Sequence, residues 1–486
     1  MSKLYVFGIG GTGSRVLKSL TMLLASGVDC GVDAIVPVII DRDMSNRDLT
    51  RTRLLIDNYI AVNNVAAKTD TNRFFRTKIE LLNGELCLQL KDNAQKFDDF
   101  IGKRAMTREN QAFVEMLFSK ETLGMDMTVG FQGNPNVGSV VLNQFEDSEL
   151  FKAFANDFNK DRGDKIFIIS SIFGGTGASG FPLLHKILRT RKTEGGLNNW
   201  GQINTAPIGA ITVLPYFSVK EATAGSLVDA NTFIDKAKAA LSYYKVMDKQ
   251  LDTMYYVADK QVSTYEHNKG GDQQRNNAHF VELAAAMAVL DFVNPNPEKK
   301  EENFQRSGNE IKETTYKEFG ILPSEQSKTP SVVTFSNLSD DDKRMLINPL
   351  SRFFLFIRYL LDEFDNQSSK QPYARHKFDK SFRNNEIMKK LEAVQGGFLD
   401  WLKEMENQNR KFIPFIWGSK NAFGFIRNDI SVKHKRYWLD LSKSKWATMD
   451  NELNKQTLNI NKTLGVEESF MELFYRATAQ LINYQD

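Results

Sequence analysis

Residues 168–182 read Ile168-Ile169-Ser170-Ser171-Ile172-Phe173-Gly174-Gly175-Thr176-Gly177-Ala178-Ser179-Gly180-Phe181-Pro182, and this stretch decides the fold of the chain. It begins as an apolar run typical of a buried strand, and four glycines follow within seven residues. From 181 to 188 the apolar spacing is helical. Glycines let a backbone approach a ligand closely, and the amides at a helix start bind anions. The stretch therefore predicts a phosphate-binding loop, with a flexible turn as the alternative.

A second loop of this kind stands at the N-terminus. The apolar run 3–9 leads into Gly8-Ile9-Gly10-Gly11-Thr12-Gly13-Ser14, and residues 15–24 continue with helical spacing. We expect the helix to start near Thr12 or Ser14, because both can cap a helix. Gly8, Gly10 and Gly13 spell G-x-G-x-x-G, which by itself suggests a dinucleotide-binding Rossmann unit.

Two further stretches have the composition of ligand loops. Asp41-Arg42-Asp43 follows the apolar run 34–40. One acidic residue there could hold a ribose, two could hold a hydrated magnesium ion beside phosphates, and a solvated turn is the third possibility. The other stretch, 130–138, contains Gly133-Asn134-Pro135-Asn136-Val137-Gly138, which is rich in turn formers and potential donors.

The pattern along the chain predicts an α/β fold with a parallel, doubly wound sheet. Buried-strand runs at 165–170, 208–214 and 254–258 alternate with helical segments, among them 224–244 and 277–292. A hydrophilic surface excursion follows at 294–310, and after Ser339 the chain becomes mainly helical. We therefore divide the chain into a nucleotide-binding domain (1–293), an excursion with a connecting strand (294–338) and a mainly helical C-terminal domain (339–486).

Composition narrows the class of protein. The 486 residues carry a formal net charge of only +3, so no overall basic field points to nucleic acid. Two cysteines, Cys30 and Cys87, suit a reducing compartment. The first residues lack the pattern of a signal peptide, and no apolar run reaches the length of a membrane span. We expect a cytoplasmic protein. The basic, aromatic segments 433–438 and 443–446 favour a protein-contact face over a nucleic-acid or membrane surface.

Taken in order, the four loops resemble those of the tubulin/FtsZ superfamily, and in particular its divergent bacterial tubulin-like members. The residues 8–13 are similar to the first glycine loop of FtsZ, 41–43 to its acidic second loop, and 133–138 to its A-N-P-x-x-G loop. Gly174-Gly175-Thr176-Gly177 matches the core of the signature G-G-T-G-[SAT]-G, although Ala178-Ser179-Gly180 puts the last glycine one position late. The resemblance spans about residues 1–345 and displaces the Rossmann oxidoreductase interpretation. The helical end of the chain resembles tubulin, or plasmid and phage tubulin-like proteins, more than FtsZ.

The resemblance implies that the chain binds GTP or GDP with Mg²⁺ at the carboxyl ends of the strands. The phosphates would contact backbone or side chains of two glycine loops: Gly10, Gly11, Thr12, Gly13 and Ser14 in the first, and Gly174, Gly175, Thr176 and Gly177 in the second. Asp41 and Asp43 would hold Mg²⁺, directly or through water, and Gly133 and Asn134 would lie near the γ-phosphate.

For the base and ribose, the family uses a polar residue on the central helix and an asparagine on the helix before it. Glu282 and Asn231 are the matching candidates here, and Glu221 is the candidate for the ribose. A carboxylate in so apolar a helix is costly unless paired, which favours Glu282, but a glutamate pointing to solvent is an equal alternative.

The resemblance also implies head-to-tail self-assembly, with hydrolysis completed by acidic residues of the next subunit. Asn337-Leu338-Ser339-Asp340-Asp341-Asp342 is the nearest analogue of the FtsZ motif N-x-D-x-x-D, which makes Asp340 and Asp342 the catalytic candidates in trans. Ser339 and Asp342 have the spacing of a capping box for the next helix, and we expect that role first. The alternative is a non-polymerising GTP-binding regulatory or scaffold protein whose C-terminal helices bind an adaptor.

Overall fold

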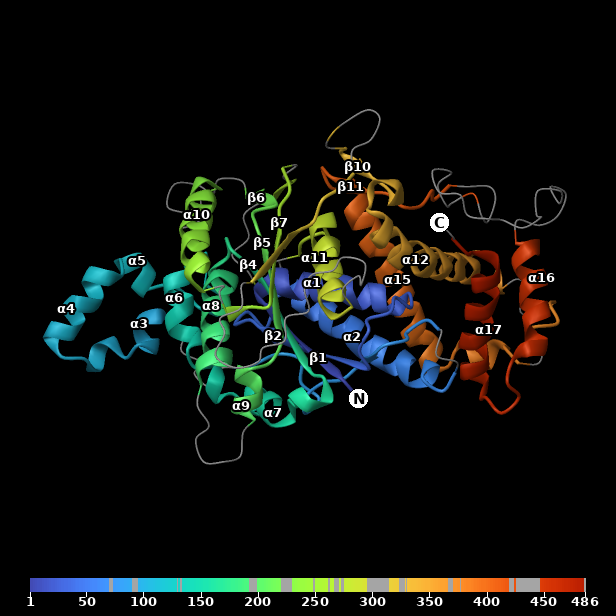
Figure 1. Ribbon diagram of the computed structural model, residues 1–486, viewed down its shortest axis with the longest axis horizontal. Coiled ribbons are helices and arrows are strands. Elements are labelled where there is room, and N and C mark those ends of the chain that lie inside the picture. The colour runs from blue at the N-terminus through green and yellow to red at the C-terminus, as the bar shows by residue number, and fades with distance from the viewer. Residues whose placement is uncertain are drawn as a thin grey trace.

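Seven parallel strands form one sheet in the computed structural model of the chain (Figure 1). In spatial order they are β3 (Lys78–Ile79), β2 (Ala34–Ile40), β1 (Lys3–Ile9), β4 (Lys165–Ser171), β5 (Ile208–Val213), β7 (Thr253–Val257) and β9 (Thr315–Glu318). The inner strands are buried along almost their whole length, as strands covered on both faces must be. The predicted parallel, doubly wound α/β fold is confirmed.

The direction of winding reverses between β1 and β4. The chain runs from β1 outward to β2 and β3, and later from β4 outward to β5, β7 and β9. β1 and β4 are direct neighbours, with Gly8 opposite Ile169. A doubly wound sheet opens a crevice at the carboxyl ends of such a strand pair. The two glycine loops follow these two strands.

Helices cover both faces of the sheet (Figure 1). One layer consists of α1 (Gly10–Ala25), α2 (Arg47–Ala66) and α11 (Phe280–Val293). The other contains α6 (Pro135–Leu142), α7 (Glu149–Asp157), α8 (Gly175–Thr190), α9 (Trp200–Asn204) and α10 (Ala230–Met247). Tyr5 and Phe7 of β1 both contact Phe154 of α7, with ring centroids 5.0 Å apart in each pair. Side chains two apart on a strand share a face, so these contacts fix the face that α7 covers.

The C-terminal part is mainly helical, as expected. Its principal helices are α12 (Asp340–Tyr359), which continues into a π-helical turn (Leu360–Phe364), α15 (Glu386–Glu406), α16 (Ala447–Gln456) and α17 (Val466–Leu481). Pro349 lies inside α12. A short parallel pair, β10 (Val332–Val333) and β11 (Lys411–Phe412), joins the start of this part to the end of α15. β10 lies in the segment 294–338, where a connecting strand was expected, and is only two residues long.

α15 attaches the C-terminal part to α1. The indole Nε1 of Trp401 donates to Ser19 Oγ at 3.1 Å, and the Lys18 ammonium lies 3.1 Å from the Glu404 carboxylate. Both pairs are buried, so α1 is enclosed by the sheet on one side and by α15 on another.

Shorter elements complete the chain. A small arm of α3 (Phe97–Phe100), α4 (Arg108–Leu117) and α5 (Lys120–Leu123) projects from the α6 side of the body (Figure 1). The others are β6 (Phe217–Val219), β8 (Ser263–Tyr265), α14 (Lys380–Arg383) and 3-10 turns at 103–105, 145–147, 160–162, 335–337 and 457–459.

The structure describes residues 1–69, 73–89, 95–128, 130–131, 133–191, 199–219, 230–247, 250–260, 263–265, 271, 275–294, 314–322, 328, 330–365, 370–375, 377–418, 424 and 446–484. The predicted excursion at 294–310 falls almost wholly outside them, as do the basic segments 433–438 and 443–445. Across the described ranges, every helix is too short or too polar to span a bilayer.

Candidate functional site

The two glycine loops meet at the β1–β4 crevice. α1 begins at Gly10, directly after β1, and α8 begins at Gly175, just after β4. Gly10 has a φ of +70°, and a Cβ built on it would lie 3.3 Å from the Cβ of Thr176 and 3.6 Å from the amide nitrogen of Gly177. Two loops that are separated by about 165 residues in the sequence therefore lie against each other.

Both helices start without a side-chain cap. Ile9 precedes α1 and Gly174 precedes α8, and neither side chain accepts a hydrogen bond from the first turn. The expectation that Thr12 or Ser14 begins α1 is wrong, because both lie inside the helix and are buried. The first amides of a helix need a partner, and two uncapped helix starts at one crevice suit an anionic ligand.

The third loop lies against the second. A Cβ built on Gly175 would be 3.1 Å from the amide nitrogen of Asn134 and 3.2 Å from that of Gly133. The side-chain oxygen of Asn134 caps α6 by accepting from the amides of Asn136 and Val137 at 3.2 and 3.3 Å. The structure thus brings the predicted γ-phosphate loop into contact with the predicted α/β-phosphate loop.

Exposure separates the candidate loop residues into two groups. Gly11, Gly133, Asn134, Gly174 and Thr176 are partly exposed, whereas six others are buried: Gly10, Thr12, Gly13, Ser14, Gly175 and Gly177. The buried group serves packing as well. A Cβ on Gly13 would lie 2.4 Å from the carbonyl carbon of Gly8, so glycine allows α1 to pack directly on β1.

The acidic loop lies next to the third loop. A Cβ on Gly130 would be 4.0 Å from the Cβ of Asp43. The carboxylate of Asp43 accepts from Ser45 Oγ at 2.9 Å and from the amide of Gly271 at 2.8 Å. Burial, with the charge of Asp43, raises the pKa of Asp41 to about 7. A nearby cation would favour the ionised form of this carboxyl.

The acidic loop fits Mg²⁺ only as part of a nucleotide site. Over the described part of the chain, no group of three or more His, Cys, Asp or Glu side chains could hold a metal ion. Protein-bound Mg²⁺ often uses one or two carboxylates and takes its other ligands from phosphates and water. Asp41 and Asp43 match that donor set.

A buried ion cluster lies directly behind the first glycine loop. The Arg15 guanidinium donates through Nε to Glu282 at 2.6 Å, through Nη1 to Asp48 at 3.2 Å and through Nη2 to the Tyr216 hydroxyl at 2.7 Å. Burial disfavours the charge on Arg15, but Tyr216, Glu282 and Asp48 together raise its pKa well above the usual value. Arg15 is therefore a fixed cation, and a Cβ on Gly11 would lie 3.5 Å from its Nη1.

The sequence interpretation missed Arg15, Asp48 and Tyr216. An available signal was the arginine itself, since a charge in the apolar, helical segment 15–24 requires a buried partner. Tyr216 and Asp48 carried no comparable signal, because they come from loops and helices far away in the sequence.

Glu282 is the best defined of the three base and ribose candidates. It is fully buried, and Oε1 accepts from Arg15 and from the Tyr216 hydroxyl at 2.7 Å. Oε2 accepts from the amide of His279 at 3.1 Å, which completes a capping box at the start of α11. The solvent-exposed alternative for Glu282 is wrong. Three of the roughly four acceptor positions of a carboxylate are thus used within the protein. Asn231 falls on α10 without a described side chain, and Glu221 lies outside the described residues.

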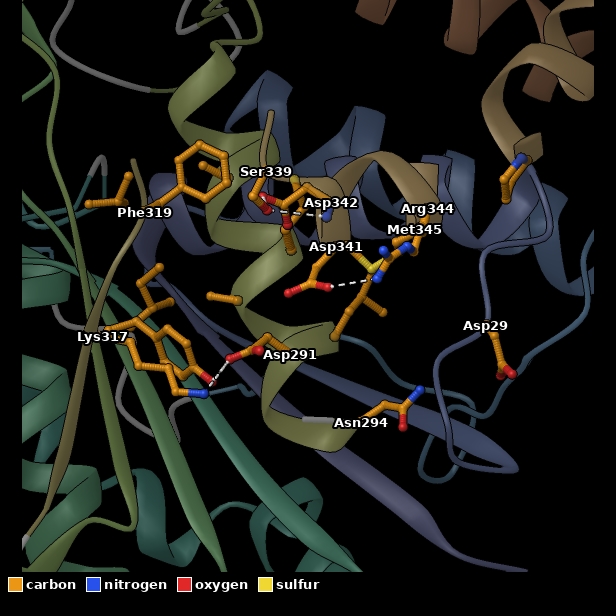
Figure 2. A pocket seen from close by; sticks show the side chains of 18 of the residues that line it. Asp29, Asp291, Asn294, Lys317, Phe319, Ser339, Asp341, Asp342, Arg344 and Met345 are labelled. Carbon is orange, nitrogen blue, oxygen red and sulfur yellow. Dashed lines mark hydrogen bonds and ion pairs between the residues drawn. The ribbon is translucent and has the colours of Figure 1, made fainter. Parts of the chain in front are cut away.

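Asp340 and Asp342 stand at the start of α12. Ser339 Oγ accepts from the amide of Asp342 at 3.3 Å and donates to its Oδ2 at 2.6 Å, so the capping role is confirmed. Asp340 has a 75% exposed side chain and lies 3.1 Å from the Lys343 ammonium. Asp342 lines a cavity of about 890 Å³ beside α11, to which the glycine loops contribute no lining residue (Figure 2).

Comparison with known proteins adds two solved structures. No family model matches the chain, and no curated protein matches it. CetZ from Methanosaeta thermophila strain DSM 6194 is 14% identical, with a TM-score of 0.25, over 60% of this chain and 51% of its own. The helical model of the TubZ-Bt two-stranded filament is also 14% identical, with a TM-score of 0.25, over 64% and 57%.

The chain spans little more than half the length of each of these two proteins. Because identity and TM-score are so low, what the chain does is inferred from its own geometry.

Proposed function

We propose that this chain is a tubulin/FtsZ-like protein that binds GTP or GDP with Mg²⁺ in the β1–β4 crevice. The two uncapped helix starts would hold the phosphates through the amides of the glycine loops. Thr176, at the rim, would donate its hydroxyl to a phosphate oxygen. Asp41 and Asp43 would hold the magnesium ion, and its charge would offset that of the phosphates.

The observation that carries this proposal is the contact between the two glycine loops. Gly10 lies against Thr176 and Gly177, and Gly175 lies against Gly133 and Asn134. These close approaches bring the first turns of α1 and α8 and residues 133–134 around one crevice, where the amide of Asn134 already donates to the Phe131 carbonyl at 2.7 Å. Fixed amide dipoles can stabilise a phosphate without a lysine. The two loops contain no lysine between 8 and 14 or between 171 and 180, so the amides would bind the phosphates here.

Identification of the bound nucleotide is the direct test. Protein purified without added nucleotide is denatured, and the released small molecules are identified by mass spectrometry. GDP or GTP supports the proposal, whereas NAD(P) would overturn it in favour of an oxidoreductase.

A matched pair of variants then tests the loop. Thr176→Val removes the rim hydroxyl from α8, and Thr190→Val removes a hydroxyl from the last turn of the same helix, where it donates to the Lys186 carbonyl. Loss of a hydrogen bond to a charged group costs about 1.5–3 kcal/mol. We expect the first variant to bind a fluorescent GTP analogue at least about tenfold more weakly and the second to bind it like the wild type.

Head-to-tail assembly is the second part of the proposal. An interface of two different surfaces can repeat without closing, as a filament requires. GTP would lie between subunits, and Asp340 of the next subunit, exposed at the start of α12, would be available to a water molecule. Negative-stain microscopy with GTP and with a slowly hydrolysed analogue tests assembly, and monodisperse particles under both conditions would contradict it.

One observation favours the alternative of a non-polymerising GTP-binding regulatory or scaffold protein with little hydrolysis. The carboxylate of Asp342 is bound to Ser339 in a helix cap, and catalysis in trans would have to release it. Phosphate release measured against protein concentration separates the two. A rate that rises more steeply than the concentration supports catalysis between subunits, and a background rate throughout supports the alternative. In that case the C-terminal helices would be the surface offered to an adaptor.

A further inference from the structure

A large cavity among the described residues lies away from the glycine loops. It encloses about 890 Å³ between α11, the strands β7 and β9, and the first turns of α12 (Figure 2). Pockets that bind small organic molecules typically measure about 300–1,000 Å³. The cavity has the size of a ligand site, so its lining decides which ligand it fits.

One wall is apolar. Ala284, Met287 and Ala288 stand at positions i, i+3 and i+4 of α11 and present one helix face to the cavity. Phe319 and Met345 also line it, from β9's end and from α12 (Figure 2). Two alanines in this face leave room for a flat or elongated apolar body along the helix.

Most charged groups of the lining are already neutralised. Lys317 lies 2.9 Å from the Asp291 carboxylate, which also accepts from the Tyr255 hydroxyl at 2.6 Å. Arg344 lies 3.4 Å from Asp341. A third pair, Arg76 and Asp29, is separated by 3.0 Å. These pairs need no ligand to balance them.

Arg352 is different. Its Nε donates to the carbonyl oxygen of Ile482 at 2.9 Å, and its side chain is also hydrogen-bonded to the neutral Tyr475. Among the described residues, no carboxylate is paired with it. The residue is half-buried, and burial lowers the pKa of its guanidinium. A guanidinium removed from water without a counter-charge is unfavourable, and its planar fork binds carboxylate or sulfonate oxygens well.

We propose that this cavity binds an organic anion, with its carboxylate or sulfonate group on Arg352 and its apolar body against the Ala284–Ala288 face of α11. The ligand would be wedged between the sheet domain and α12. This site is separate from the nucleotide crevice and independent of whether the chain binds GTP.

A pair of fluorescent probes tests the anionic group and the apolar body of the proposed ligand separately. The anion 8-anilinonaphthalene-1-sulfonate and its neutral counterpart N-phenyl-1-naphthylamine share the same rings and differ in the sulfonate. Each probe is titrated against four full-length proteins: wild type, Arg352→Gln, Ala288→Phe and Arg358→Gln. Arg358→Gln is the control, because Arg358 lies about one and a half turns further along α12 and pairs with Asp362. Circular dichroism and thermal unfolding establish that each variant is folded.

We expect one sulfonate probe per chain, bound about tenfold more weakly by Arg352→Gln because a charge-assisted contact is lost. The neutral probe should bind equally to wild type and to this variant. Ala288→Phe should weaken both probes, and Arg358→Gln neither. The proposal is overturned by absent or non-stoichiometric binding of the sulfonate probe, by equal affinity of wild type and folded Arg352→Gln, or by binding that Ala288→Phe leaves unchanged.

Discussion

Replacing Glu282 by glutamine tests whether the buried ion cluster holds the central helix α11 against α1. The carboxylate accepts hydrogen bonds from Arg15, from Tyr216 and from the amide of His279. Arg15 and Glu282 are 5% and 0% exposed. Glutamine has nearly the same shape and can keep a neutral acceptor for one or two of these donors, so the change removes mainly the charge.

The expected loss in free energy of unfolding follows from the burial of the ion pair. Breaking a buried ion pair from one side costs about 3–5 kcal/mol, because the remaining charge is left in a medium of low dielectric constant. Arg15 retains Asp48 at 3.2 Å, so we expect the lower end, about 3 kcal/mol. The pair Arg53–Glu85 is the control: it is separated by 3.6 Å, its side chains are 38% and 48% exposed, and such pairs contribute about 0–1 kcal/mol.

Urea unfolding of wild type, Glu282→Gln and Glu85→Gln measures the difference. We expect a clear drop in the midpoint urea concentration for Glu282→Gln, with an unchanged dependence of the unfolding free energy on urea. For Glu85→Gln we expect almost no change in the midpoint. The double variant Arg15→Met/Glu282→Gln should lose less than the sum of the two single variants, because neither charge is then left alone. Equal midpoints for Glu282→Gln and Glu85→Gln would refute the view that this cluster stabilises the junction.

Three further outcomes are expected. Gly13→Ala should unfold the protein or lower its free energy of unfolding by several kcal/mol, because the new Cβ would lie 2.4 Å from the Gly8 carbonyl carbon. Gly201→Ala is the control: a Cβ there would have no atom within 4 Å, so the change should be neutral or slightly stabilising. Thermal unfolding distinguishes the two variants. Burial lowers the pKa of His279 to about 3, so the unfolded chain takes up this proton near pH 6.5 and the folded chain does not. The contribution of neutral His279 to the free energy of unfolding is therefore complete above pH 6.5 and should fall by about 1.4 kcal/mol per pH unit below it. Urea titrations at pH 7.5 and 5.5 measure this fall, and His279→Asn should lack it. Asp41→Asn should abolish the enhancement of nucleotide affinity by Mg²⁺, measured by titration with and without the ion; an undiminished enhancement would exclude Asp41 as a ligand.

Elements whose signal is local could be predicted from the sequence alone. The strands 34–40 and 165–171 are continuous apolar runs, which form only where both faces are covered, and their alternation with helices required a parallel sheet. The loop order also located the crevice, since loops that follow parallel strands lie at one edge of the sheet. The cap formed by Ser339 and Asp342 was likewise predictable, because it needs only a spacing of three residues.

Elements that depend on distant partners could not be predicted. The helix start at Gly10 was misplaced, because a serine or threonine cap is the usual local signal, whereas α1 begins without a side-chain cap at the point where Gly10 lies against Thr176 and Gly177. Glu282 could be singled out as a buried carboxylate, but the identity of its partners could not, since Arg15 and Tyr216 lie 267 and 66 residues away.

The sequence by itself thus determined the sheet, its winding and the composition of the loops, because hydrophobic periodicity and glycine spacing act within a few residues. Only the tertiary structure decided which charges are neutralised. Arg15 is compensated by carboxylates from α2 and α11, whereas Arg352, equally ordinary in the sequence, has neutral partners, the Ile482 carbonyl and Tyr475, beside a cavity. The physical reason is that the free energy of a buried charge depends on the few groups within about 4 Å, and the fold brings those groups together from anywhere in the chain.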